Sequence, residues 1–263
     1  MKFSKKTLED VTHSRLNGLR FIISYLEENN VSGKKVADLS AGSGFVTNLW
    51  AEAGATIEAY DLYPDVFKQS HLTCSKMDLT RPLPLLSETY DCILLMETIE
   101  HIPDQFLLLQ EIARILKPNG RLILTKPNNS SFSGRLANLW TEGERSNMYL
   151  PNEKTLISYD NGNEYLGRFF LLGAQKLRSL ATKSKLDIEE IYPNQFSNSS
   201  LVWGILLYPF LWIRSVLTRR KLIKNLPAAS EEITAINEQH QLNINPTVLL
   251  HKHFCVVFQK VAE

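Results

Sequence analysis

A short turn with two glycines is the first feature of this sequence that could do chemistry. Its residues, Asp38-Leu39-Ser40-Ala41-Gly42-Ser43-Gly44, follow an apolar run and precede a stretch with helical character. Glycine lets a backbone come close to a ligand, and the free N–H groups at the start of a helix bind polar or anionic atoms. The pattern therefore favours a nucleotide-binding turn, with a plain tight turn as the alternative.

Two carboxylates stand at the ends of the next two apolar runs. Asp61 lies roughly 20 residues beyond the turn, where a carboxylate can accept hydrogen bonds from both hydroxyls of a ribose. Asp78 follows the third run, where it could accept from an adenine amino group while Leu79 packs on the ring. Capping of the next turn or helix is the alternative for either aspartate. With the turn, the two aspartates indicate a bound nucleoside.

Short strands that alternate with helices are needed to position these residues. Strands are expected over Lys35–Leu39, Thr56–Tyr60, Leu72–Met77, Asp91–Met96, Arg121–Thr125, Leu186–Ile191 and His253–Gln259. Helices are expected over Leu8–Glu28, Gly44–Ala53, Pro103–Leu116 and Gln175–Lys183. Such alternation needs crossover connections, which give a parallel sheet covered on both faces. The predicted fold class is α/β, with a doubly wound, Rossmann-like, mostly parallel sheet of seven strands.

The sequence resembles the class I S-adenosylmethionine-dependent methyltransferases, particularly the small-molecule group with an Asp-x-x-x-Gly-x-Gly turn. The resemblance rests on five ordered motifs: Asp38 to Gly44, Asp61, Asp78-Leu79, Tyr90 to Asp104 and Leu116 to Leu122. It implies that S-adenosylmethionine is the cofactor, with Asp61 at its ribose and Asp78 and Leu79 at its adenine. It further implies that the methionine end lies against Asp38, Ser40, Ala41, Gly42 and Gly44, and we expect Glu97 to line the same end. Ser40 replaces the usual first glycine of the family, which keeps an inactive relative open as an alternative.

Glu97, Glu100 and His101 form a Glu-x-x-Glu-His cluster where the fourth strand opens to the cofactor cleft. We expect His101 to face the acceptor as a candidate general base, with a backbone-bonded structural histidine as the alternative. A similar cluster binds a divalent metal in the small-RNA methyltransferases, which need a further histidine downstream. This chain has no histidine between His101 and His240, so no metal site is predicted. His251 and His253, at the final strand, are expected to be structural.

The chain is expected to form one methyltransferase domain over residues 1–263. An N-terminal helix lies within 1–30, the cofactor-binding core spans 31–127, and 128–170 is an inserted loop region near the acceptor site. Residues 195–245 form an apolar and basic helical elaboration before the last strand. Its most apolar part, Leu201 to Leu217, is too short before Arg214 for the ~20 residues of a membrane span. We expect it to lie on a membrane surface or to cover an apolar acceptor, with a buried helix pair as the alternative.

Composition limits the partners and the compartment. A net charge of +1 offers no general attraction to polyanions, so no nucleic-acid partner is expected. Cys74, Cys92 and Cys255 lie apart in apolar runs, as buried thiols in a reducing compartment do. The charged N-terminus lacks the apolar core of a secretory signal. We expect a cytoplasmic protein that associates with a membrane surface through 201–224.

The predicted function is S-adenosylmethionine-dependent methyl transfer to a small-molecule or lipid-like acceptor. Transfer from a sulfonium is an in-line displacement, so the protein mainly has to align the acceptor and exclude water. A nucleic-acid or protein methyltransferase on the same fold is one alternative. A non-catalytic scaffold that retains the fold is the other. The sequence predicts neither the acceptor atom nor the oligomeric state.

Overall fold

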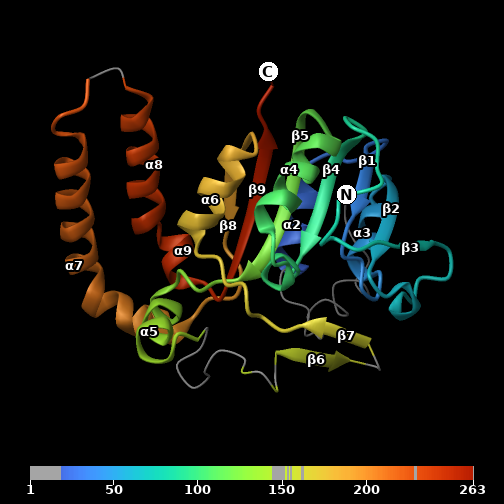
Figure 1. The fold of residues 1–263 in the computed structure, drawn as a ribbon, viewed down its shortest axis with the longest axis horizontal. Coiled ribbons are helices and arrows are strands. Elements are labelled where there is room, and N and C mark those ends of the chain that lie inside the picture. Colours follow the sequence, from blue (N-terminus) through green and yellow to red (C-terminus); the bar gives the residue numbers. More distant parts are fainter. Residues whose placement is uncertain are drawn as a thin grey trace.

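A seven-stranded sheet with helices on both faces forms the centre of the protein in a computed structural model (Figure 1). The structure describes residues 19–143, 152, 154, 156–160, 163–227 and 230–262. The strand order is β3-β2-β1-β4-β5-β9-β8. Five strands run parallel, and β9 is antiparallel to both of its neighbours, β5 and β8. The predicted doubly wound, mostly parallel α/β sheet is confirmed.

The strands lie close to the runs that the sequence marks. They are β1 Lys35–Asp38, β2 Thr56–Asp61, β3 Cys74–Lys76, β4 Tyr90–Met96, β5 Leu116–Pro127, β8 Leu186–Tyr192 and β9 His253–Lys260. The fifth strand begins earlier than the expected Arg121, because the chain turns directly from helix into strand at Leu116. Asn119, in the first part of β5, has a left-handed backbone conformation, at φ 61°.

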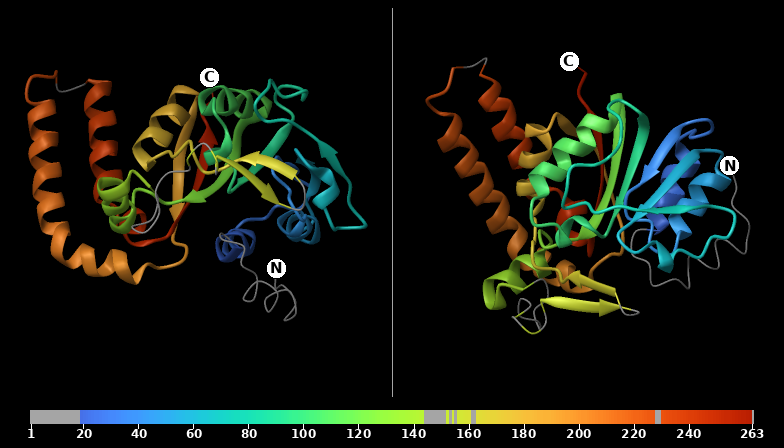
Figure 2. Two further views of the ribbon diagram at one scale, coloured as in Figure 1. Left: turned by 60° about the horizontal axis from the view of Figure 1, so that its bottom comes forward. Right: turned by 45° about the vertical axis from the view of Figure 1, so that its right-hand side comes forward.

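The helices divide between the two faces of the sheet (Figures 1 and 2). Helices α2 (Leu19–Glu28) and α3 (Phe45–Glu52) cover one face, and α4 (Gln105–Ile115) and α6 (Ala174–Lys183) cover the other. Short 3-10 turns, η1 (Pro64–Val66) and η2 (Ile99–His101), follow β2 and β4. The expected N-terminal helix is described from Leu19 onward, and its predicted first part lies outside the described residues.

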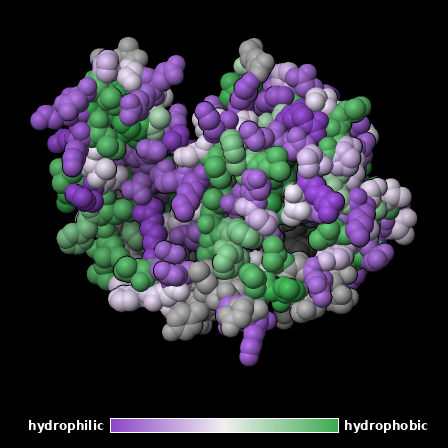
Figure 3. Space-filling model, in the orientation of Figure 1, coloured by the Kyte–Doolittle hydropathy of each residue, from purple (hydrophilic) through white to green (hydrophobic). Residues whose placement is uncertain are grey.

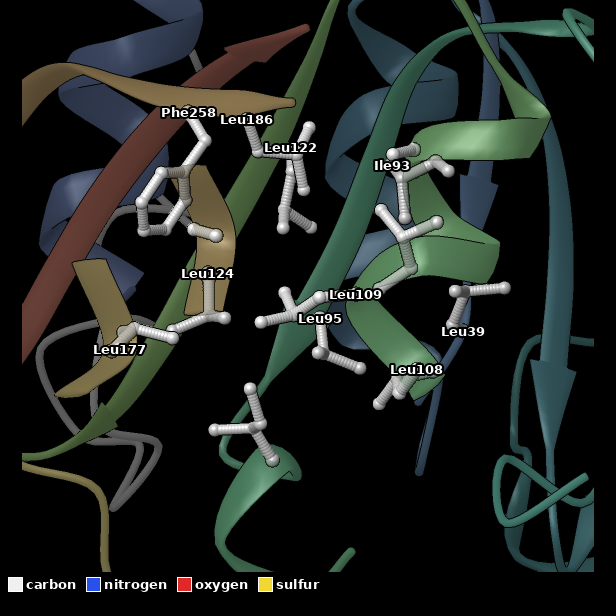
Figure 4. Close-up of a cluster of buried hydrophobic side chains, with 14 of the residues drawn as sticks. Leu39, Ile93, Leu95, Leu108, Leu109, Leu122, Leu124, Leu177, Leu186 and Phe258 are labelled. Carbon is white, nitrogen blue, oxygen red and sulfur yellow. The ribbon is translucent and has the colours of Figure 1, made fainter. Parts of the chain in front are cut away.

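Alternation along each strand builds two apolar cores. On β4, Ile93 and Leu95 point to the α4 and α6 side, whereas Cys92 and Leu94 point to the α2 and α3 side. Figure 4 shows the first of these cores, where Leu108 and Leu109 of α4 meet the sheet and Leu177 of α6 extends the cluster. Because both faces of the central strands are buried, their middle residues are mostly apolar, as in other parallel sheets.

The described residues of the inserted region form regular structure in place of the expected loop. It contains a helix, α5 (Phe132–Thr141), and a two-stranded hairpin of β6 (Ile157–Asp160) and β7 (Asn163–Leu166). Ser131 caps α5 by accepting from the N–H of Gly134 at 3.1 Å, and Phe132 and Ala137 bury one side of it. The loop interpretation was wrong here because the many polar residues hid a capped, half-apolar helix.

A helical pair stands beside the sheet in the elaboration before β9. The long helix α7 (Asn198–Ile223) runs next to α8 (Glu231–Ile244), and the short α9 (Pro246–Leu250) leads into β9. In the space-filling view a notch lined by hydrophilic residues separates the upper part of this pair from the sheet (Figure 3). The elaboration is attached to the rest of the domain through the contacts of α7 with α5, through α9, and through the contacts of α8 with α6, where Arg178 and Glu238 form an ion pair at 2.6 Å.

Candidate active site

The glycine turn connects β1 to α3 at the carboxyl edge of the sheet. Gly42 and Gly44 both have left-handed backbones, at φ 51° and 79°. A side chain at Gly44 would overlap the ring of Phe67, so the turn requires glycine there. A Cβ at Gly42 would meet no atom within 4 Å, so this part of the turn faces open space. The turn thus has the form that a bound nucleotide needs, with exposed backbone and no side chain in the way.

Asp38 shapes this turn from beneath. Its side chain is buried and accepts hydrogen bonds from the Thr47 hydroxyl at 2.8 Å and from the Ser40 N–H at 3.3 Å. Burial raises the pKa of Asp38 to about 6, and the two hydrogen bonds oppose that rise. With these contacts Asp38 positions the turn, and the predicted direct contact with the cofactor stays a prediction. Ala41 is also buried and donates its N–H to the carbonyl of Tyr60 at 3.0 Å.

Asp61 stands at the end of β2 beside the turn. Its carboxylate accepts from the Gly42 N–H at 2.8 Å and from the Tyr63 N–H at 2.9 Å. Each oxygen receives one bond and keeps further acceptor capacity. The carboxylate is therefore held in one orientation beside open space, as the predicted ribose contact requires.

Asp78 and Leu79 follow β3, next to the end of β2. One oxygen of Asp78 accepts from the N–H and the hydroxyl of Thr80, at 2.9 and 2.7 Å, and the other lies 3.3 Å from Arg81. The Thr80 hydrogen bonds lower the pKa of Asp78. Leu79 is buried in the core. These contacts are those of a capped turn, and the adenine roles of both residues stay predictions.

A charged cluster lies where β4 ends. Glu97 has a left-handed backbone, at φ 48°, and its carboxylate contacts His253 Nδ1 at 3.2 Å and Arg168 at 3.8 Å. Glu100 is fully buried, 3.8 Å from Arg168, and neither carboxylate oxygen has a hydrogen-bond partner. Burial, followed by the charge of Glu97, raises the pKa of Glu100 to about 8. Near neutral pH Glu100 is therefore mostly protonated.

His101 faces the inserted hairpin. Its Nδ1 contacts the carbonyl of Leu166 at the end of β7, and burial lowers its pKa. Because a carbonyl only accepts, the Leu166 contact requires a proton on Nδ1. Arg168, just beyond β7, reaches both glutamates, so residues of the insertion border this edge of the sheet.

The sequence did not predict that His253 and Arg168 belong to this cluster. His253 was expected to be structural, and Arg168 lies in the region expected to be a loop. The order of strands brings His253 to Glu97, because the start of β9 lies beside the end of β5. Among the described residues, no group of three or more His, Cys, Asp or Glu side chains is arranged to hold a metal ion.

The helical pair lies apart from these residues. A cavity of about 310 Å³ lies between α7 and α8, lined among others by Arg214, Ser215, Arg219 and His240. None of its lining residues belongs to the turn or to the Glu97 cluster. The apolar segment thus has its own surroundings, whereas the insertion 128–170 contacts the candidate site.

Comparison with known proteins supports the class that this fold and turn define. Residues 12–169, more than half of the chain, match the family model of the methyltransferase domain. The chain belongs to the methyltransferase domain family, whose cofactor in the resembled class is S-adenosylmethionine. The predicted family resemblance is confirmed.

Two curated relatives carry the name ubiquinone biosynthesis O-methyltransferase. The one from Haemophilus ducreyi is 30% identical over 128 residues, which cover 44% of this chain and 54% of that protein. The one from Xylella fastidiosa is 30% identical over 132 residues, covering 46% and 53%. The chain spans about half the length of the curated relatives it matches.

Solved structures share the fold across nearly the whole chain. A SAM dependent methyltransferase from Archaeoglobus fulgidus matches with a TM-score of 0.54 at 14% identity, covering 98% of this chain and 100% of that one. An S-adenosylmethionine dependent methyltransferase from Mesorhizobium loti matches with a TM-score of 0.52 at 13% identity, covering 92% and 97%. At such identities the likeness shows the fold alone.

Proposed function

We propose that this chain transfers the methyl group of S-adenosylmethionine to an oxygen atom of a small, apolar acceptor. When bound, the cofactor supplies a methyl group on a positively charged sulfur. The chain has to hold the nucleoside, align the acceptor hydroxyl and take up its proton. The family and the name of the curated relatives support this assignment.

Cofactor binding is assigned to the turn and to Asp61. The open side of Gly42 leaves room for a ligand against the backbone, and Asp61 keeps acceptor capacity beside it. Two ribose hydroxyls are donors that such a carboxylate can bind. The donor set and the open space therefore fit S-adenosylmethionine.

The observation that carries O-methylation is the fixed tautomer of His101. A hydroxyl acceptor has to lose its proton, and a positioned imidazole can take it. The Leu166 carbonyl holds the proton on Nδ1, so Nε2 is the basic atom. Burial lowers the pKa of His101, so its neutral, basic form prevails at neutral pH. We assign His101 as the general base, with the Glu97–His253 pair as its neighbour across the end of β4.

The acceptor and the location are part of the same proposal. The two relatives are named for ubiquinone biosynthesis, which supports a small-molecule or lipid-like acceptor here. Three free thiols, two of them buried, support a reducing, cytoplasmic compartment. An apolar acceptor is dissolved in membranes, so we also place the enzyme at a membrane surface.

Radiolabel from the methyl group of S-adenosylmethionine tests the proposal. The purified chain is incubated with a total lipid extract, total RNA or a protein lysate, and label is counted in each fraction. We expect label in the lipid fraction, bound to oxygen by mass spectrometry, and clearly less label with Asp61→Asn when the cofactor is below saturation. Label found only in RNA or protein would show that the acceptor is a nucleic acid or a protein. No label in any fraction, from a chain that still binds the cofactor, would support a non-catalytic scaffold.

A further inference from the structure

Helix α7 is apolar on the side that faces solvent. Its buried residues are Ser200, Gly204 and Ser215, whereas Ile205 is 71% exposed and Phe210 72%. In a water-soluble protein the apolar stripe of a surface helix faces the core. The burial pattern of α7 is the reverse, and green residues cover the lower outer side of this helix in Figure 3.

The buried residues of α7 are small, and hydrogen bonds join α7 to α8. Gly204 packs against the ring of Phe132 on α5, and a Cβ there would lie 3.3 Å from it. Ser215 contacts His240 of α8 at 2.8 Å, and Arg219 donates to Asn237 of α8 at 2.6 Å. Small residues and interhelical hydrogen bonds are typical of helices packed in lipid.

Positive charge gathers at the carboxyl end of the same helix. No Asp, Glu, Lys or Arg occurs between Asn198 and Ile213, and Arg214, Arg220, Lys221 and Lys224 follow, all exposed. Within the described part of the chain none of these four cations forms an ion pair or hydrogen bond. Trp203 and Trp212 are also exposed, at 42% and 47%, and such rings favour the boundary between headgroups and acyl chains. Apolar, aromatic and basic side chains thus follow one another on one exposed helix.

We propose that α7 docks on an anionic lipid bilayer without crossing it. Its apolar outer side would enter one leaflet, and its basic end would lie among anionic headgroups. This inference rests on the proposed function, because an apolar acceptor would be drawn from that leaflet. Helix α5 links this surface to the end of β5, since it begins just after that strand and packs on α7.

Attachment along α7 argues against a spanning helix. By length and composition, α7 is the one helix in the described residues that could cross a membrane. However, its inner side is bound to α5, α8 and α9, and α8 carries the exposed Glu231 and Glu232. A crossing would bury these charges in hydrocarbon or break the polar contacts with α8. Within α7, the uncharged part before Arg214 runs only from Asn198 to Ile213, which is shorter than the ~20 helical residues of a span.

Flotation of the full chain with lipid vesicles tests this proposal without any acceptor. One vesicle type is phosphatidylcholine alone, and the other contains phosphatidylglycerol as well. We expect co-flotation with the anionic vesicles that weakens as salt is added. Ile205→Glu with Phe210→Glu should reduce binding at least about tenfold, and Arg220→Glu should reduce it about fivefold.

Thr234→Glu is the control, because it places one glutamate on the exposed side of α8, away from α7's apolar side. It should bind vesicles as the wild type does, and all variants should keep their affinity for S-adenosylmethionine, which reports an intact fold. The proposal is overturned by a wild type that floats with neither vesicle type or by α7 variants that float unchanged. A wild type that binds no vesicles and is a dimer in solution, with α7 variants that are monomers, would show that the apolar side of α7 binds a second copy of the chain instead. Flotation without methylation would contradict only the proposed function.

Discussion

The hydroxyl of Ser40 bridges the ends of β1 and β4 by contacting both backbone groups of Met96. It accepts from the Met96 N–H at 3.0 Å and donates to the Met96 carbonyl at 3.3 Å. The first glycine expected of the family has no atom to make these bonds. The hydroxyl of Ser40 therefore stabilises the turn. The replacement of glycine by serine at this position then has a structural reason and need not mark an inactive relative.

Replacing Ser40 by glycine should weaken the fold more than cofactor binding. The Met96 N–H would lose its partner, at a cost of about 1–2 kcal/mol in the free energy of unfolding. Urea denaturation measures this loss, and calorimetric titration with S-adenosylmethionine should give an unchanged affinity. An affinity that rises markedly in Ser40→Gly would mean that the hydroxyl obstructs the ligand.

Replacing Asp61 by asparagine should reduce the affinity for S-adenosylmethionine and S-adenosylhomocysteine at least about tenfold. The reason is that hydrogen bonds to a carboxylate are worth about 1.5–3 kcal/mol. Calorimetric titration measures the affinity, and circular dichroism should show an intact fold. Asp65→Asn is the control, since Asp65 is exposed on η1 a few residues away. Equal affinities in the two variants would remove Asp61 from the cofactor site.

His101→Gln should lower the methylation rate by roughly 10²–10⁴-fold while leaving cofactor affinity unchanged. The base works only as neutral imidazole, and burial lowers the pKa of His101. The wild-type rate should therefore stay level through neutral pH and fall only below the usual histidine range. A rate profile that breaks above that range, or a full rate in His101→Gln, would show that another group takes the proton.

Glu100 should make the protein less stable as the pH rises. Burial raises its pKa from the usual 4.5 to about 8 in the folded protein, so the folded state holds a proton that the unfolded state has released. As the pH rises between these two values, the free energy of unfolding falls, and the contribution of the retained proton to stability is fully lost only above about pH 8. Glu100→Gln removes this titration, so its thermal unfolding should change less between pH 5 and pH 8 than that of the wild type. Parallel profiles would show that Glu100 ionises normally.

A chelator should leave the methylation rate unchanged. The His253–Glu97 contact brings a histidine to the Glu-x-x-Glu-His motif, yet the described residues form no three-ligand group. Activity is measured after dialysis against EDTA and again after adding Mg²⁺, Mn²⁺ or Zn²⁺. Loss on dialysis with recovery by one ion would assign a metal role to Glu97, Glu100 and His101.

The sequence by itself determined the α/β class, the order of its strands and helices, and the edge of the sheet where the motifs meet. These follow from local signals: apolar runs of strand length, the left-handed glycines of the turn, and aspartates at strand ends. Parallel strands place their carboxyl ends together, so Asp38, Asp61 and Glu97 had to share one edge.

Only the tertiary structure decided which partners complete that edge and which way α7 faces. His253 and Arg168 reach Glu97 from far along the chain, through strand order and the inserted hairpin, neither of which leaves a local pattern. The composition of α7 suits a core helix and a lipid-facing helix equally well. Its exposure depends on whether other elements cover it, and the packing of α5, α8 and α9 leaves only Ser200, Gly204 and Ser215 of α7 buried.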